Sequence, residues 1–131
     1  MTTLIESDIP AFLDRFNSFN DAVLRELKIS YKDNGNLNIS VAIATQDVNE
    51  KENDGWVCVR LDILNVADFC FSENAEFSNQ VLSQGIHILA FSDGIGFDFG
   101  FFADAPESIS ELKNSKTFAI GESAAWAVEA Y

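Results

Sequence analysis

The chain has 131 residues, enough for one domain with its own hydrophobic core, and its 21 acidic and 8 basic side chains give a net charge of −13. A field of this sign repels nucleic acid and anionic membranes and attracts basic proteins. The first residues lack the basic leader of a secretory signal, and no apolar run reaches the roughly 18 residues of a membrane span, so we expect a cytoplasmic protein that binds neither membrane nor nucleic acid.

The first predicted element is a short helix over residues 8–15. Ser7 or Asp8 is a suitable N-cap, and Pro10 falls in the first turn, where a proline costs no hydrogen bond. The helix ends in the polar stretch "NSFND". Three apolar side chains are spaced to face inward: Phe12, Leu13 and Phe16.

Residues 22–31 fit a helix or a strand, because their apolar side chains satisfy both spacings. The sequence that follows decides between the two. Residues 32–36, "KDNGN", contain an Asn-Gly pair, and in "LNISVAIA" at 37–44 apolar residues alternate with small or polar ones. An Asn-Gly turn between alternating runs is a strong hairpin signal, so residues 22–31 are predicted to form the first strand of a hairpin.

A third, long strand is predicted over residues 56–71, where apolar residues again alternate with polar ones. The alternation slips at residues 65–68, which indicates a bulge or a bend. Residues 72–85 are ambiguous between a loop and a short helix around residues 76–82.

A second hairpin is predicted from residue 85 to residue 102, with its turn at "SDG". The outer face of its second strand carries Gly96, Asp98 and Gly100, and such small positions suit a covering element, a strongly bent strand or a binding groove. Residues 103–116 are predicted to form a turn and a short helix capped by Ser108 or Ser110. The chain then ends in a strand pair or a bulged strand.

These elements predict an α+β fold for residues 1–131 as a single domain. The fold is a mostly antiparallel twisted sheet of five to seven strands built from hairpins, with a short N-terminal helix and one or two further short helices. The buried face of the hairpins and the long strand is predicted to include Ile39, Val41, Ile43, Val59, Leu61, Ile88, Phe97 and Phe99.

No combination of residues predicts catalysis, a metal site or a cofactor. His87 is the one histidine, and the sequence lacks a GxSxG nucleophile motif to accompany it. Cys58 and Cys70 have neither CxxC spacing nor histidine neighbours, so we expect two reduced thiols. The acidic loop at residues 46–55 lacks the ligand order of an EF-hand. We therefore expect a protein that is not an enzyme and needs no cofactor.

Residues 19–27, "FNDAVLREL", resemble the opening of small bacterial immunity proteins from contact-dependent growth inhibition and other polymorphic-toxin systems. Phe19, Asp21 and Ala22 match the F-H-D-(A/S) motif of that group, and Asn20 replaces its histidine. The order of predicted elements is also similar. The resemblance implies a cytoplasmic protein that binds and neutralises a cognate toxin domain, often a nuclease, whose basic cleft would attract an acidic inhibitor.

Contacts to a basic toxin are expected in exposed acidic segments, because loops place charge where a partner reaches it. An alternative, which the sequence leaves open, is a non-enzymatic small-ligand-binding or scaffold domain with its binding surface on residues 94–100. The oligomeric state is also left open. The predicted partner-binding residues are Asp47, Glu50, Glu52, Asp54 and Trp56 around the first loop, and Asp68, Glu73 and Glu76 after the third strand, with Trp126 and Tyr131 as further aromatic anchors.

Overall fold

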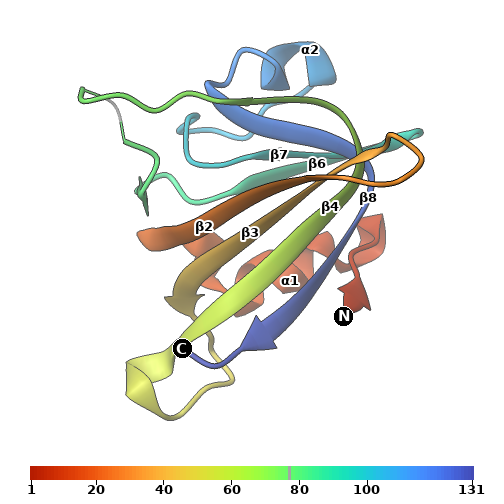
Figure 1. The fold of residues 1–131 in the computed structure, drawn as a ribbon. Helices are drawn as coiled ribbons and strands as arrows, with labels where there is room; N and C mark the ends of the chain where they lie inside the picture. The colour runs from red at the N-terminus through yellow and green to blue at the C-terminus, as the bar shows by residue number, and fades with distance from the viewer. Residues whose placement is uncertain (77) are drawn as a thin grey trace.

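Residues 1–76 and 78–131 are described by a computed structural model, in which the strands form one antiparallel sheet with short helices around it (Figure 1). In chain order the elements are β1 (Thr2–Thr3), the 3-10 turn η1 (Glu6–Asp8), α1 (Ile9–Arg15), the 3-10 turn η2 (Asn17–Phe19), β2 (Ala22–Tyr31), β3 (Leu37–Gln46), the 3-10 turn η3 (Asn53–Gly55), β4 (Trp56–Phe71), β5 (Val81–Leu82), β6 (His87–Phe91), β7 (Gly94–Asp98), α2 (Ile109–Leu112) and β8 (Thr117–Glu129).

The sheet has the strand order β5-β2-β3-β4-β8-β7-β6, and β1 pairs with β8 beside this path. The α+β class and the mostly antiparallel sheet are therefore confirmed. The described residues contain eight strands, however, where the sequence predicts five to seven. The shortest are β1 and β5, and a strand of two residues is too short to show an alternating pattern.

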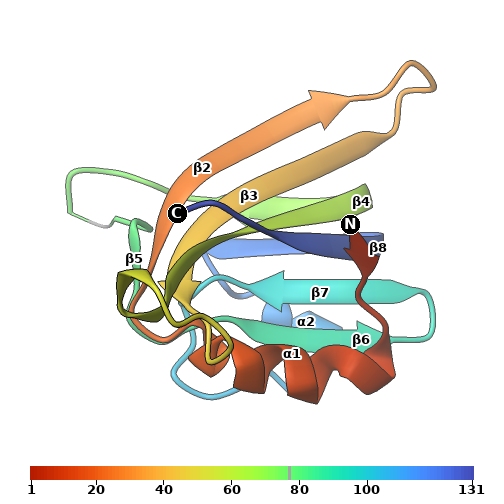
Figure 2. The ribbon, with the colours of Figure 1, turned by 90° about the horizontal axis from the view of Figure 1, so that it is seen from below.

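The sheet curls, and α1 lies against its concave side (Figure 2). The helix prediction is confirmed, since α1 begins at Ile9 with Asp8 at the cap position and a proline in its first turn. Phe12 and Phe16 are buried, and the ring of Phe12 lies 5.1 Å from that of Trp126 on β8, measured between centroids. These aromatic contacts attach the helix to the sheet.

The first hairpin is also confirmed. Tyr31 pairs with Leu37 across the turn, and Gly35 takes a positive φ of +85° there, a conformation that glycine adopts without strain. β4 then pairs antiparallel with β3. Its pairing with β8 shifts between Val66 and Asp68, which confirms the predicted bulge.

The second hairpin consists of β6 and β7, and its small outer residues accommodate a covering helix. A Cβ atom on Gly96 would collide with the end of the Leu112 side chain of α2, so a larger residue fits beneath this helix only if Leu112 shifts. Ser108 caps α2, as predicted, by accepting a hydrogen bond of 3.1 Å from the backbone N–H of Glu111. Because α2 packs on Gly96 and Asp98 is fully buried, the outer face at these two residues is not an open binding surface, contrary to the alternative prediction.

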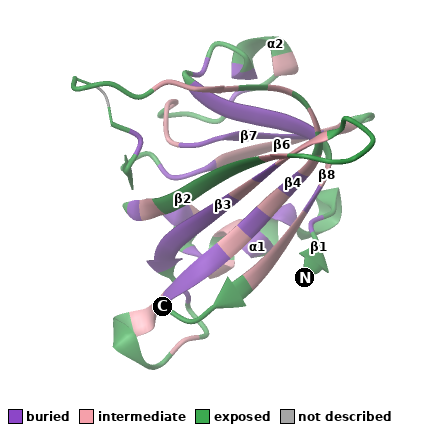
Figure 3. Ribbon diagram, in the orientation of Figure 1, coloured by how far each residue is buried: buried purple, intermediate pink, exposed green. Residues whose placement is uncertain are grey.

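Burial follows the predicted register closely (Figure 3). Seven of the eight residues predicted to be buried have exposed fractions of 1% or less; Ile88, on the terminal strand β6, is half-buried. The described part of residues 72–85 contains the short strand β5 and no helix, and residue 77 lies outside the described residues. Residues 117–129 form one continuous strand.

Candidate functional site

The loop between β3 and β4 is held to α1 by an ion pair. Arg15 donates two hydrogen bonds to Asp47, from Nε to Oδ1 at 3.0 Å and from Nη2 to Oδ2 at 2.9 Å, and the Asp47 side chain is only 4% exposed. Burial opposes ionisation of Asp47, but the hydrogen bonds from Arg15 and the Asn49 backbone outweigh it and lower its pKa. The prediction that Asp47 is exposed for partner contact is therefore wrong, because this carboxylate is used inside the molecule.

The remaining loop carboxylates differ in how far they reach solvent. Glu50 is half-buried, and its Oε1 accepts hydrogen bonds of 2.9 Å from the backbone N–H groups of Lys51 and Glu52. Glu52 and Asp54 are exposed, as predicted. Val48 is an exposed apolar side chain, 73% accessible, in the same loop. The loop therefore presents two exposed carboxylates, Glu52 and Asp54, and one exposed apolar side chain, Val48.

Trp56 is a half-buried residue rather than a projecting anchor. Its ring lies 6.2 Å from the ring of Tyr131, and the guanidinium of Arg25 lies 4.6 Å from the same tyrosine centroid. The C-terminal tyrosine thus packs between β4 and β2. Trp126 is also half-buried, because it packs on α1, whereas Tyr131 is 54% exposed.

The second predicted segment lies at the other end of β4 (Figure 1). Asp68 forms an exposed ion pair of 3.5 Å with Lys113, and Glu73 accepts a 2.7 Å hydrogen bond from the backbone N–H of Asn79. Glu76 is exposed. Because about twelve residues of strand at roughly 3.3 Å each separate Trp56 from Asp68, the two acidic segments are on the order of 40 Å apart along β4. The structure does not bring them together into one site.

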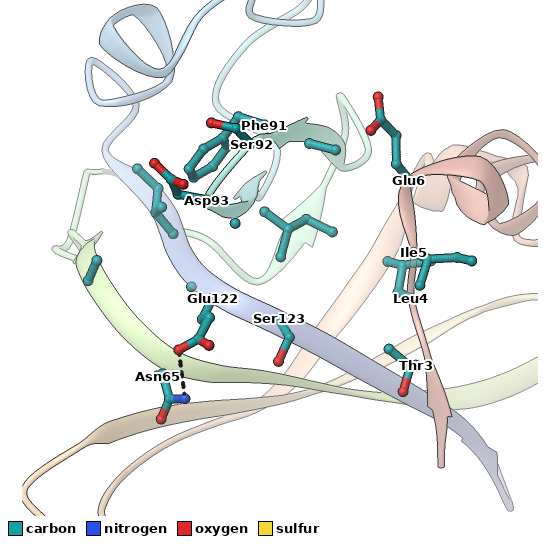
Figure 4. A pocket seen from close by; sticks show the side chains of 16 residues that line it. Thr3, Leu4, Ile5, Glu6, Asn65, Phe91, Ser92, Asp93, Glu122 and Ser123 are labelled. Carbon is teal, nitrogen blue, oxygen red and sulfur yellow. Dashed lines mark hydrogen bonds between the residues drawn. The ribbon is translucent and has the colours of Figure 1, made fainter.

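A groove with a volume of about 810 Å³ opens instead between the N-terminal segment and the turn joining β6 to β7 (Figure 4). Its floor includes Leu4 and Ile95 of the main core, each of which is 5% exposed or less. Ile120 also lines it, but its side chain belongs to the cluster beneath α2, on the other face of the sheet. Glu6, Asp93 and Glu122 line it from three different segments and are all exposed. The groove therefore combines an apolar floor with an acidic rim, which is the chemistry that accommodates a lysine or arginine side chain.

The groove coincides with an interruption in the pairing of β8. Gly121 is the last β8 residue that pairs with β7, while Ala125 pairs with β1 and the Ala124 carbonyl accepts a 2.9 Å hydrogen bond from the Leu4 N–H. In the described structure Glu122 and Ser123 have no strand partner on this edge. Glu122 is held from below, where its Oε2 accepts a 3.0 Å hydrogen bond from Asn65 (Figure 4).

The sequence does not predict this groove. Its three carboxylates come from a 3-10 turn, a hairpin turn and a strand, and each stands in an unremarkable local sequence. They share one groove only because the N-terminal segment pairs with β8, and β1 is too short to be recognised in advance. The only related signal in the sequence is the excess of acidic residues, and this excess does not indicate where on the surface they gather.

The groups considered for chemistry are dispersed. Within the described residues, no three His, Cys, Asp or Glu side chains are grouped to hold a metal ion. His87 is half-buried, with Nε2 2.9 Å from the Phe102 carbonyl oxygen. Cys58 and Cys70 are free, and burial together with Glu129 raises the pKa of Cys58. No helix in the described part of the chain is long and apolar enough to cross a membrane.

Comparison with known proteins gives no match, either to a family model, to a curated protein or to a solved structure. The groove and the distribution of charge are therefore the basis on which a function can be assigned.

Proposed function

We propose that this chain is a binding protein that neutralises a basic protein partner, as a bacterial immunity protein does with its cognate toxin. The observation that carries the proposal is the groove beside β8, where Glu6, Asp93 and Glu122 surround an apolar floor. A lysine or arginine of the partner would lay its aliphatic stem on the floor and place its charge among the carboxylates.

The net charge of −13 supports the same partner class. Long-range attraction accelerates the encounter with a basic protein, and contacts that exclude water then slow its release. In this scheme the exposed loop carboxylates Glu52 and Asp54 steer the partner, and the groove retains it. The immunity role itself rests on the resemblance of residues 19–27, with Asn20 in place of the usual histidine.

The alternative of a small-ligand domain loses the surface on which it was based. The outer face of β7 is covered by α2, and Asp98 there accepts a 2.7 Å hydrogen bond from Ser115 within the interior. The groove beside β8 is open and acid-rimmed, whereas sites for small molecules are usually enclosed and mostly apolar.

The experiment is to express the product of the neighbouring gene, with and without this chain, and to follow bacterial growth. We expect that product to be toxic alone, this chain to restore growth, and the two purified proteins to bind each other with an affinity that falls as salt is raised. A toxic product that neither binds this chain nor is neutralised by it would overturn the proposal.

A further inference from the structure

Among the described residues, the outer edge of β2 has no partner strand over most of its length (Figure 2). β5 pairs only with Ala22 and Val23, and one further hydrogen bond of 2.7 Å joins the Leu24 N–H to the Gln80 carbonyl. Beyond that point the β2–β3 register shifts at Arg25, and residues 26–31 pair with β3 on one side only in the described structure. An unpaired edge of this length is a template for another strand.

The backbone orientation along this edge follows from the hairpin turn. The N–H of Lys32 donates a 2.7 Å hydrogen bond to the Asn36 carbonyl, so Lys32 faces β3. Backbone groups alternate in an antiparallel pair, and therefore the N–H and C=O groups of Leu27, Ile29 and Tyr31 point away from β3. These are the groups that a new strand would bond.

The side chains of the same three residues form an exposed apolar row. Their exposed fractions are 37% for Leu27, 42% for Ile29 and 80% for Tyr31, and β2 is largely exposed in Figure 3. On the opposite face of the strand stand Glu26, Lys28 and Ser30. A partner strand would therefore meet one apolar face and one charged face.

The charge of this edge distinguishes it from the rest of the molecule. Residues 25–33 carry Arg25, Lys28 and Lys32 against Glu26 and Asp33, whereas the whole chain has a net charge of −13. A strongly basic partner is not attracted to such a stretch. A second copy of β2 meets little local repulsion at this edge, because the stretch carries both signs of charge and can place them opposite one another, although two whole chains of charge −13 repel at long range.

We propose that two copies of this chain pair through β2, as antiparallel strands related by a two-fold axis at Ile29. In this register Ile29 lies opposite Ile29 of the second copy, and Leu27 lies opposite Tyr31 of the second copy. Glu26, whose Oε1 accepts a 2.8 Å hydrogen bond from Arg60 of its own chain, lies opposite Lys32 of the second copy, and both Glu–Lys contacts occur because the pairing is symmetric. The pairing adds about six backbone hydrogen bonds and makes one continuous sheet.

Neighbouring registers are less favourable. An axis at Lys28 places Lys28 opposite itself, and an axis at Ser30 places Lys28 opposite Lys32. An axis at Leu27 places residues 29–31 opposite residues 23–25 of the second copy. β5 and Gln80 already occupy the edge there. Of these registers, only the axis at Ile29 pairs the whole unpaired edge of β2 and places Glu26 opposite Lys32 of the second copy.

The first test is sedimentation velocity of the purified chain, without any partner, up to about 1 mM. We expect a concentration-dependent dimer, and Ile29→Lys, which puts two charges at the axis, should weaken it by about tenfold or more. Val128→Lys is the matched control, because Val128 on β8 is 39% exposed and the charge change is the same. A monomer at every concentration, or equal effects of the two variants, would overturn the proposal.

The second test fixes the register and does not depend on how Ile29→Lys folds. Glu26→Lys and Lys32→Glu should each weaken the dimer by placing like charges opposite one another, and the double variant should restore it. Amide hydrogen exchange at Leu27, Ile29 and Tyr31 should slow as the dimer forms. Failure of the double variant to recover dimer, or unchanged exchange at these three amides, contradicts the proposed pairing, whatever the outcome for the toxin.

Discussion

Arg15 and Asp47 connect α1 to the loop after β3 through two parallel hydrogen bonds, although 32 residues separate them in sequence. The loop is further held by a 3.0 Å hydrogen bond from the Val48 N–H to the Arg15 carbonyl. A loop that looks like a flexible acidic segment is therefore a fixed part of the fold. Only its outer carboxylates remain available to a partner.

Replacing Asp47 by Asn should lower the free energy of unfolding by about 1–3 kcal/mol, because Arg15 loses a bidentate partner in a site that is buried on one side only. Urea unfolding at pH 7 measures the loss. Asp68→Asn is the matched control, since its ion pair with Lys113 is exposed on both sides and should contribute less than about 0.5 kcal/mol. Equal losses in the two variants would show that the Arg15–Asp47 pair has no special role.

The same pair predicts a pH dependence. The folded-state pKa of Asp47 lies below its ordinary value of 3.8, so the unfolded chain binds the proton more tightly. The stability contributed by ionised Asp47 is thus fully present above that ordinary value and is lost as the pH falls through the lower folded value. Unfolding measured at a series of acidic pH values should show wild type and Asp47→Asn converging as the pH is lowered. A difference that stays constant or widens would contradict this linkage.

The contact between Gly96 and α2 predicts an unusual response to a small substitution. Alanine in place of a strand glycine is ordinarily stabilising, but here the added Cβ collides with Leu112. We expect Gly96→Ala to lower the free energy of unfolding by about 1–3 kcal/mol. Leu112→Ala should itself be destabilising, and the double variant should lose less than the sum of the single losses, because it relieves the collision. Additive losses would contradict the packing described.

The two cysteines should differ in reactivity. Cys58 is 7% exposed, and burial together with Glu129 raises its pKa, so little thiolate is available to react. Cys70 is half-buried. With a thiol reagent and mass spectrometry we expect Cys58 to be labelled more slowly than Cys70 in the native protein, and both to be labelled rapidly in urea. Faster native labelling of Cys58 would contradict its burial.

The hairpins and the bulge could be predicted because their signals are local. Ile39, Val41 and Ile43 alternate within one strand, and the slip near Asn65 is visible in the same strand that bends. The burial of Asp47 could not be predicted from the loop sequence, because it depends on Arg15, which lies 32 residues earlier in the chain. The groove was missed for the same reason. Glu6 and Glu122 line the same groove because β1 pairs with β8, and a strand of two residues is too short to show a periodic pattern.

The central claim is that the groove beside β8 retains a basic partner, and the most direct measurement is the dissociation rate of the complex with the neighbouring gene's product. Two variants are compared, each with three fewer negative charges: Glu6→Gln, Asp93→Asn and Glu122→Gln in the groove, and Glu50→Gln, Glu52→Gln and Asp54→Asn in the loop. We expect the groove variant to dissociate about tenfold faster or more, and the loop variant to associate more slowly with little change in dissociation. A groove variant that dissociates at the wild-type rate would contradict the claim.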